Sequence, residues 1–177
     1  LIPKNIKYYN ELFEAAKLFC SLKFYPDETF LEFSLLDFRI YFTVSLLLKE
    51  YEWAQNFANE YINYLPFELR ENELIYCNGI LCFKNKKFNE SLNYFSKVTI
   101  EDIEEKIVVR LYTLMNYIEM NDIEGALSML ASVKQFSFEN KTIPANKLTS
   151  LQTSLKFMNE IIKSLSTGKK LDYAIYQ

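Results

Sequence analysis

Residues 82–91, CFKNKKFNES, align with two other stretches of the chain, SLLLKEYEWA at 45–54 and YIEMNDIEGA at 117–126. In each stretch an apolar residue in a turn precedes a small residue by three positions. The small residues are Ala54, Ser91 and Ala126, and they are 37 and 35 residues apart. Two antiparallel helices approach closely only where the side chain at the crossing is small. The alignment therefore predicts three helix hairpins of the same construction.

The rest of the chain also has helical periodicity, and no segment alternates between apolar and polar residues as a half-buried strand does. The expected helices are 6–24, 28–49, 51–64, 68–83, 87–97, 101–120, 122–136 and 145–166. Asp27 and Thr99 are the expected N-caps of the second and sixth helices, 137–144 is an expected loop, and the last helix should stop near Gly168. One hairpin cannot bury its own apolar face, so neighbouring hairpins are expected to stack. The predicted fold is all-α, an antiparallel helix-hairpin stack of about eight helices.

The composition bounds the chemistry that the chain can perform. With 177 residues, 50% of them hydrophobic, the chain can form one domain with a sizeable core. It contains no histidine, which excludes serine–histidine and cysteine–histidine nucleophile pairs and histidine metal sites. Gly79, Gly125 and Gly168 stand alone, so no glycine-rich phosphate loop is present. We therefore expect no catalytic residue, no cofactor and no metal, and a protein that is not an enzyme.

Charge argues against a nucleic-acid partner. The 20 basic and 23 acidic residues give a net charge of -3 and are spread along the chain. Nucleic-acid binders normally have a basic face, because neutralising phosphates supplies much of their affinity. The three cysteines, Cys20, Cys77 and Cys82, have no framework spacing, so we expect reduced thiols in a core.

The most apolar stretch, residues 40–48, is too short to span a bilayer, which needs about 20 residues. No signal or transit peptide is visible, which favours a cytoplasmic protein. The sequence opens with Leu1 rather than methionine, so it is expected to be a fragment of a longer chain.

The hairpin pattern resembles the tetratricopeptide repeat (TPR), a helix hairpin with a recurring set of small and aromatic positions. The second copy matches best. Ile75 stands at the tryptophan position, Gly79 at the glycine, Phe88 at the turn aromatic, Ser91 at the alanine and Phe95 at the phenylalanine.

Other positions depart from the TPR pattern. Cys82 and Ser45 stand where a tyrosine is usual, and Leu114 replaces the glycine of the third copy. The resemblance implies degenerate repeats at about 35–66, 72–100 and 107–136, with flanking or capping helices at 4–24 and 145–166. It thus implies a single TPR-like domain over residues 1–177, wound as a right-handed superhelix. From Lys49 onward the chain also resembles the C-terminal part of uncharacterised bacterial proteins that end in such repeats, a family to which no activity is assigned.

In TPR arrays the first helix of each hairpin lines a concave groove that binds extended peptides. The resemblance therefore implies partner-binding positions at Arg39, Thr43, Tyr76, Ile80, Phe83, Leu111 and Met115. These positions lack the lysines and asparagines with which one TPR subgroup clamps a C-terminal carboxylate. Such an apolar groove either accepts an amphipathic helix or hydrophobic peptide, or is filled by the chain's own terminal helices.

The expected function is therefore a non-catalytic scaffold that binds a protein or peptide partner. The alternative is an architectural module of a larger protein that forms a homo-oligomer through its tyrosine-rich terminal helices. No nucleic acid and no membrane span is expected in either case.

Overall fold

The computed structural model describes residues 6–22 and 33–168, and within them it contains eight α-helices, one short 3-10 helix and no strand. The helices are α1 (Ile6–Ser21), α2 (Leu35–Leu47), α3 (Tyr51–Tyr61), the 3-10 turn η1 (Ile62–Tyr64), α4 (Phe67–Lys84), α5 (Phe88–Phe95), α6 (Ile103–Glu119), α7 (Ile123–Glu139) and α8 (Ala145–Thr167). The chain forms two compact units, Leu1–Lys84 and Asn85–Gln177, here named the N-terminal unit and the C-terminal unit. The predicted all-α class and number of helices are confirmed.

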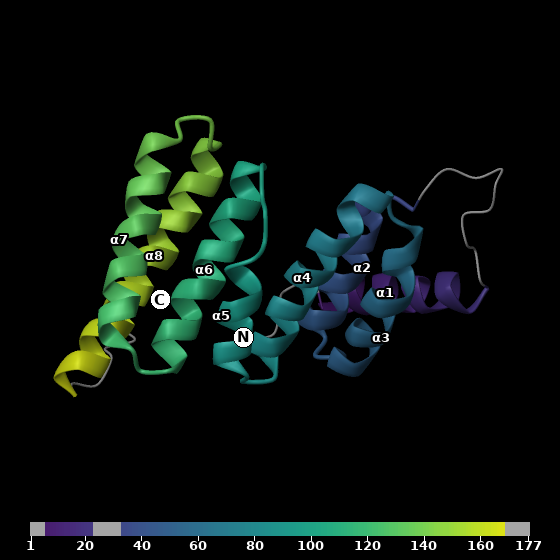
Figure 1. Cartoon of the computed structure of the whole chain (residues 1–177), viewed down its shortest axis with the longest axis horizontal. Helices are drawn as coiled ribbons and strands as arrows, with labels where there is room; N and C mark the ends of the chain where they lie inside the picture. The colour runs from purple at the N-terminus through teal and green to yellow at the C-terminus, as the bar shows by residue number, and fades with distance from the viewer. Residues whose placement is uncertain (1–5, 23–32, 169–177) are drawn as a thin grey trace. The chain divides into compact units, whose positions relative to one another are not determined.

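Inside each unit, each helix packs mainly against the next helix along the chain. The N-terminal unit joins α1 to α2, α2 to α3 and α3 to α4. The C-terminal unit joins α5 to α6, α6 to α7 and α7 to α8. Figure 1 shows the helices α6, α7 and α8 side by side. This is the sequential packing expected of stacked hairpins.

The second predicted helix begins later than the sequence suggested. Phe33 and Ser34 are not helical, and α2 begins at Leu35. The Ser34 hydroxyl accepts a hydrogen bond from the Leu36 N–H at 3.2 Å, and the Phe33 N–H donates to the Tyr64 carbonyl at 3.0 Å. These bonds fix both residues outside the helix. Residues 28–32 and the expected cap Asp27 lie outside the described residues.

The prediction of Thr99 as a helix cap is wrong. The N-cap of α6 is Asp102, whose carboxylate accepts from the Glu105 N–H at 3.0 Å. A carboxylate at this position also interacts favourably with the positive end of the helix dipole. The predicted end of the last helix near Gly168 is confirmed. The last residue of α8 is Thr167, and Gly168 follows it as the C-cap in the left-handed conformation, with φ of 67°.

The predicted loop at 137–144 is wrong for its first three residues, because α7 continues to Glu139. Ser137 stays helical by donating its hydroxyl to the Lys134 carbonyl at 2.8 Å. Asn140 then closes the helix, since its side-chain amide donates to the Phe136 carbonyl at 2.7 Å. The connection to α8 is therefore only the short segment 140–144.

The three predicted hairpin turns share one backbone conformation. Lys49, Lys86 and Asn121 have positive φ values of 65°, 62° and 56°, and each lies five residues before one of the aligned small residues. In the first turn the Glu50 N–H donates to the Ser45 carbonyl at 2.9 Å. The third turn has the equivalent bond, from the Asp122 N–H to the Tyr117 carbonyl at 2.9 Å. This is the Schellman arrangement, which ends a helix and usually contains glycine at the left-handed position.

Replacing Lys49 with glycine should therefore raise the free energy of unfolding of the N-terminal unit by about 0.5–1 kcal/mol, because a lysine side chain is strained at positive φ. Urea titration followed by the fluorescence of Trp53, the single tryptophan, measures this change. The matched control is Glu50→Gly, since Glu50 has φ of -81° and gains nothing from glycine. An equal gain in both variants would contradict the argument.

The aligned small residues are fully buried. Ala54, Ser91 and Ala126 are each 0% exposed. The Ser91 hydroxyl on α5 accepts a hydrogen bond from the Asn116 side-chain amide on α6 at 2.9 Å, so the contact between α5 and α6 is partly polar.

Changing any of these three residues to leucine should destabilise the protein by about 1–3 kcal/mol, because the larger side chain overpacks a closed contact. Thermal melts followed by circular dichroism measure the loss. Ala131→Leu is the control for Ala126→Leu, because Ala131 lies on the same helix and is exposed. Unchanged melting temperatures for all three variants would show that the alignment of the hairpins is wrong.

The cores of the two units differ in chemistry. The N-terminal unit is built on stacked rings, with Trp53 against Phe57 and Phe57 against Tyr61, each pair at 4.9 Å between ring centroids. The C-terminal unit has an aliphatic core formed by Leu114, Ala126, Leu130, Val133, Leu151, Leu155 and Ile162. Both cores leave one side of their helices to solvent, as amphipathic helices do.

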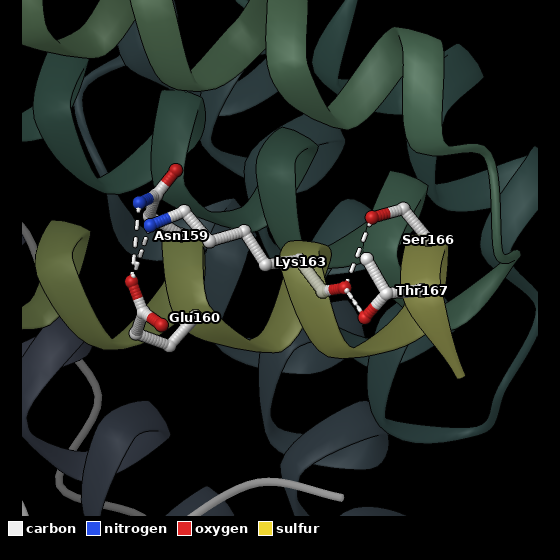
Figure 2. A network of polar contacts seen from close by, with 5 residues as sticks. All are labelled: Asn159, Glu160, Lys163, Ser166 and Thr167. Carbon is white, nitrogen blue, oxygen red and sulfur yellow. Dashed lines mark hydrogen bonds and ion pairs between the residues drawn. The ribbon is translucent and has the colours of Figure 1, made fainter. Parts of the chain in front are cut away.

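Two side chains in the last turn of α8 bond back to one carbonyl of the preceding turn. The hydroxyl groups of Ser166 and Thr167 both donate to the Lys163 carbonyl, at 2.9 and 2.8 Å (Figure 2). The Lys163 ammonium in turn pairs with the Glu160 carboxylate at 2.8 Å, in the same picture.

Candidate functional site

An uncovered apolar stripe runs along α2. Leu36, Ile40, Thr43 and Leu47 follow helical spacing on one face, and all four are exposed. Leu36 is 68% and Leu47 is 47% exposed, which is high for side chains of this kind. The side of α2 that packs in the N-terminal unit is formed by the buried residues Phe38, Phe42, Val44, Ser45 and Leu46. The stripe, in contrast, is exposed to solvent.

Beside the stripe, a groove of about 270 Å³ lies between α1 and α2. It is lined by Tyr9 and Leu12 from α1 and by Arg39, Ile40, Thr43, Val44 and Leu47 from α2. Most of these groups are apolar, so the groove favours apolar side chains over polar ones. We refer to it as the α1–α2 groove.

Arg39 connects the α1–α2 groove to the interior. Its Nε donates to Glu73 Oε1 at 2.9 Å and its Nη2 donates to Glu73 Oε2 at 2.5 Å, a two-point contact between α2 and α4. Glu73 is only 2% exposed, whereas the Arg39 side chain is 25% exposed. The guanidinium also lies over the Tyr76 ring, 5.5 Å from its centroid. The charge of Arg39 is therefore neutralised inside the unit, and the ion pair fixes α2 against α4.

The ion pair affects a buried thiol one turn further along α4. Burial raises the pKa of Cys77 well above its usual value of about 9, the Glu73 carboxylate raises this pKa further, and the Arg39 guanidinium opposes the rise. Cys77 is 0% exposed and has no disulfide partner. The predicted burial in a core is confirmed for this residue. Cys20, which also forms no disulfide, is half-buried, and burial raises the pKa of its thiol as well.

Iodoacetamide at pH 8 should therefore modify Cys20 at least about a hundredfold faster than Cys77 in the folded protein, because Cys77 reacts only when its unit opens. Mass spectrometry of tryptic peptides over time measures both rates. Sub-denaturing urea should accelerate the Cys77 reaction alone, and comparable rates without urea would contradict the burial.

The residues that the TPR resemblance implied as partner-binding lie in both units. The N-terminal unit brings three of them together, because Arg39 and Thr43 line the groove and the Tyr76 ring lies beneath the Arg39 guanidinium. On the same α4, Ile80 is 4% exposed and Phe83 is half-buried. The C-terminal unit holds Leu111 and Met115 on α6, both half-buried, and Leu111 packs on the aliphatic core.

The sequence did not identify the exposed members of the α1–α2 groove. Ile40 and Leu47 lie in the stretch 40–48, which is apolar almost throughout, so its spacing does not separate a covered face from an open one. Tyr9 and Leu12 belong to the first helix, which the TPR resemblance makes a flanking or capping element without binding positions. In the structure both line the groove, and Leu12 is 36% exposed.

Two further observations concern residues 6–22 and 33–168 only. Within them no helix is long and apolar enough to cross a membrane, and no three cysteine, aspartate or glutamate side chains gather as a metal site requires. No family model, curated protein or solved structure matches this chain.

Proposed function

We propose that this chain is a non-catalytic protein-interaction module, and that the α1–α2 groove receives a segment of a partner protein. The observation that carries the proposal is the exposed stripe of α2 beside the groove, with Leu36 68% and Leu47 47% exposed. Contiguous apolar surface of this kind is rare on isolated proteins and typically marks an interaction site.

The binding free energy would come from burying these side chains. Covering apolar surface contributes about 25 cal/mol per Å², and a groove of about 270 Å³ accommodates a large side chain of the partner. An amphipathic helix laid along α2 could present such side chains at matching helical spacing. Thr43 would contribute a hydroxyl among the apolar contacts, and Arg39, whose charge Glu73 already neutralises, would contribute mainly its aliphatic stem.

A TPR-like architecture belongs to the same proposal. Its support is the common left-handed residue in the three turns and the complete burial of Ala54, Ser91 and Ala126 at equivalent positions. In a repeat array each hairpin needs this close approach between its helices, because neighbouring hairpins bury the apolar surface that one hairpin leaves open.

A displayed peptide library tests the proposal. Peptides are selected on the intact chain and then measured against the Ile40→Lys/Leu47→Lys variant, whose two new charges lie in the groove. The expected result is that selected peptides lose at least about tenfold in affinity for this variant. Leu18→Lys is the matched control, because Leu18 is a 59% exposed leucine on α1 that does not line the groove. Peptides that bind both variants as tightly as the parent chain would overturn the proposal.

Self-association is the second candidate, favoured by the exposed Tyr8. This ring is 66% exposed on α1, one residue from the groove-lining Tyr9. A second copy of the chain would bury both the ring and the stripe. Light scattering over a concentration series should then detect a dimer at low micromolar concentration, and Ile40→Lys/Leu47→Lys should dissociate it. A monomer throughout this range would exclude the candidate.

A further inference from the structure

A second cavity, of about 450 Å³, lies in the C-terminal unit, where the end of α7, the 140–144 connection and the first half of α8 meet. Its apolar lining comes from Phe138 of α7, Ile143 of the connection, and Leu148 and Leu155 of α8. Ile143 and Leu155 are buried and form its floor, whereas Phe138 is 84% exposed at the rim. We refer to it as the α7–α8 pocket.

Three lysines surround this apolar lining. Lys134 comes from α7, Lys141 from the connection and Lys156 from α8. Among the described residues no acidic side chain lines the pocket, and none of these three ammonium groups forms an ion pair. The neighbouring Glu139 lies outside the lining and accepts a hydrogen bond from Gln135 at 2.8 Å.

The carbonyl groups at the end of a helix carry partial negative charge, which could balance the charge of these lysines. At the end of α7, two of the nearby carbonyls already accept hydrogen bonds from other groups. The Phe136 carbonyl accepts two hydrogen bonds from Asn140, one from its side chain at 2.7 Å and one from its backbone N–H at 3.1 Å. The Lys134 carbonyl accepts from the Ser137 hydroxyl at 2.8 Å. The first turn of α8 contains no acidic side chain that would balance the lysines. An apolar cavity with an uncompensated cationic rim is complementary to a ligand that is both apolar and anionic.

We propose that the α7–α8 pocket binds an acidic amphipathic segment of a partner protein, which inserts a large apolar side chain over Ile143 and Leu155 and places carboxylates opposite Lys134, Lys141 and Lys156. The three lysines come from three different elements and so match several carboxylates spread along a segment. A single-chain lipid has one head group for the same three charges. Phe138, open at the rim, adds aromatic surface of the kind that interfaces use. The inference rests on the proposed function in one respect, since both take the chain to bind proteins, but it concerns a different unit and a different chemistry.

The test uses a fluorescein-labelled synthetic amphipathic peptide of about four helical turns, with leucine and phenylalanine on one face and glutamate on the other. Its twin has glutamine in place of every glutamate. Fluorescence anisotropy with the intact chain should give saturable binding of the glutamate peptide, weakening as salt rises from about 0.05 to 0.5 M. The glutamine twin should bind at least about tenfold more weakly.

Variants place the binding at the pocket. Lys134→Glu/Lys156→Glu should weaken the glutamate peptide by about tenfold or more, and Phe138→Ala by about fivefold. The control Lys86→Glu/Lys97→Glu changes the net charge equally at exposed lysines outside the pocket, and should leave affinity within about twofold. Circular dichroism verifies that each variant is folded.

Three results would overturn the inference: equal affinity for the two peptides, equal losses in the pocket and control double variants, or lysine-dependent binding of laurate without binding of the glutamate peptide. The last would make the pocket a site for lipid anions. Ile40→Lys/Leu47→Lys should not affect the glutamate peptide, because these residues lie in the N-terminal unit. If the glutamate peptide does not bind while the library selection succeeds, the proposal for the α7–α8 pocket is wrong and the proposal for the α1–α2 groove still stands.

Discussion

Arg39→Met should destabilise the N-terminal unit by about 3–5 kcal/mol, one of the two largest effects we expect from a single substitution in this protein. The variant leaves the Glu73 carboxylate 2% exposed and without the two hydrogen bonds that it accepts from the guanidinium. An uncompensated buried charge has lost its hydration and gained no partner, so its desolvation cost falls fully on the folded state. The link between α2 and α4 is lost at the same time.

Urea titration followed by Trp53 fluorescence measures this loss, because Trp53 lies on α3 of the same unit. The double variant Arg39→Met/Glu73→Leu should recover most of the stability, since a pair of apolar groups replaces the ion pair without leaving a charge behind. Lys7→Met is the control for an exposed pair. Lys7 lies 3.8 Å from Glu11, both side chains are more than half exposed, and the loss should stay below about 1 kcal/mol. A loss below that value for Arg39→Met would mean that Glu73 finds water or another donor.

Phe57→Ala should destabilise the same unit by about 3–5 kcal/mol through a different mechanism, the opening of a cavity. Phe57 is 3% exposed and its ring lies at the centre of the aromatic cluster. Trp53 and Tyr61 flank the ring at 4.9 Å, and Phe38 approaches it at 5.2 Å. Because Phe57 holds rings on both sides, the cluster cannot collapse around alanine without moving α3 against α2.

Phe57→Ala removes the ring stacked on Trp53 at an interplanar angle of 9°, so tryptophan fluorescence changes even in the folded variant. Circular dichroism is therefore the primary measurement. Phe57→Leu should cost less, about 1.5 kcal/mol or below, because it keeps much of the volume. Phe67→Ala is the matched control, since Phe67 is 82% exposed and its loss opens no cavity. Equal losses for Phe57→Ala and Phe67→Ala would contradict the central position of Phe57.

The helices of this protein were predictable from sequence because they depend on local spacing. Helical periodicity located the eight helices, and the errors lie at their ends. Ser34 and Asp102 cap helices through bonds to the N–H groups of Leu36 and Glu105, whereas by residue type the expected caps Asp27 and Thr99 suit a helix start equally well. The end of α7 was missed because Ser137 bonds within the helix instead of turning the chain.

The site was less predictable because it depends on which faces the neighbouring helices cover. The TPR resemblance implied partner-binding positions at Arg39 and Thr43, which stays a prediction, and in the structure both residues line the α1–α2 groove. The partner of Arg39 is Glu73 on α4, 34 residues away, and only the folding of the N-terminal unit brings the two together. The α7–α8 pocket was missed altogether, because Lys134, Lys141 and Lys156 come from three separate elements and form no cluster in the sequence.

The packing of each helix against the next one along the chain also affects the rate of folding. Nearly all tertiary contacts inside a unit join segments that are close in sequence, so little loop entropy is lost before the contacts form. Proteins of low contact order cross their folding barrier in microseconds to milliseconds. Each unit can therefore be rapidly rebuilt after a transient opening, so short exposure of its many rings to solvent gives aggregation little time to begin.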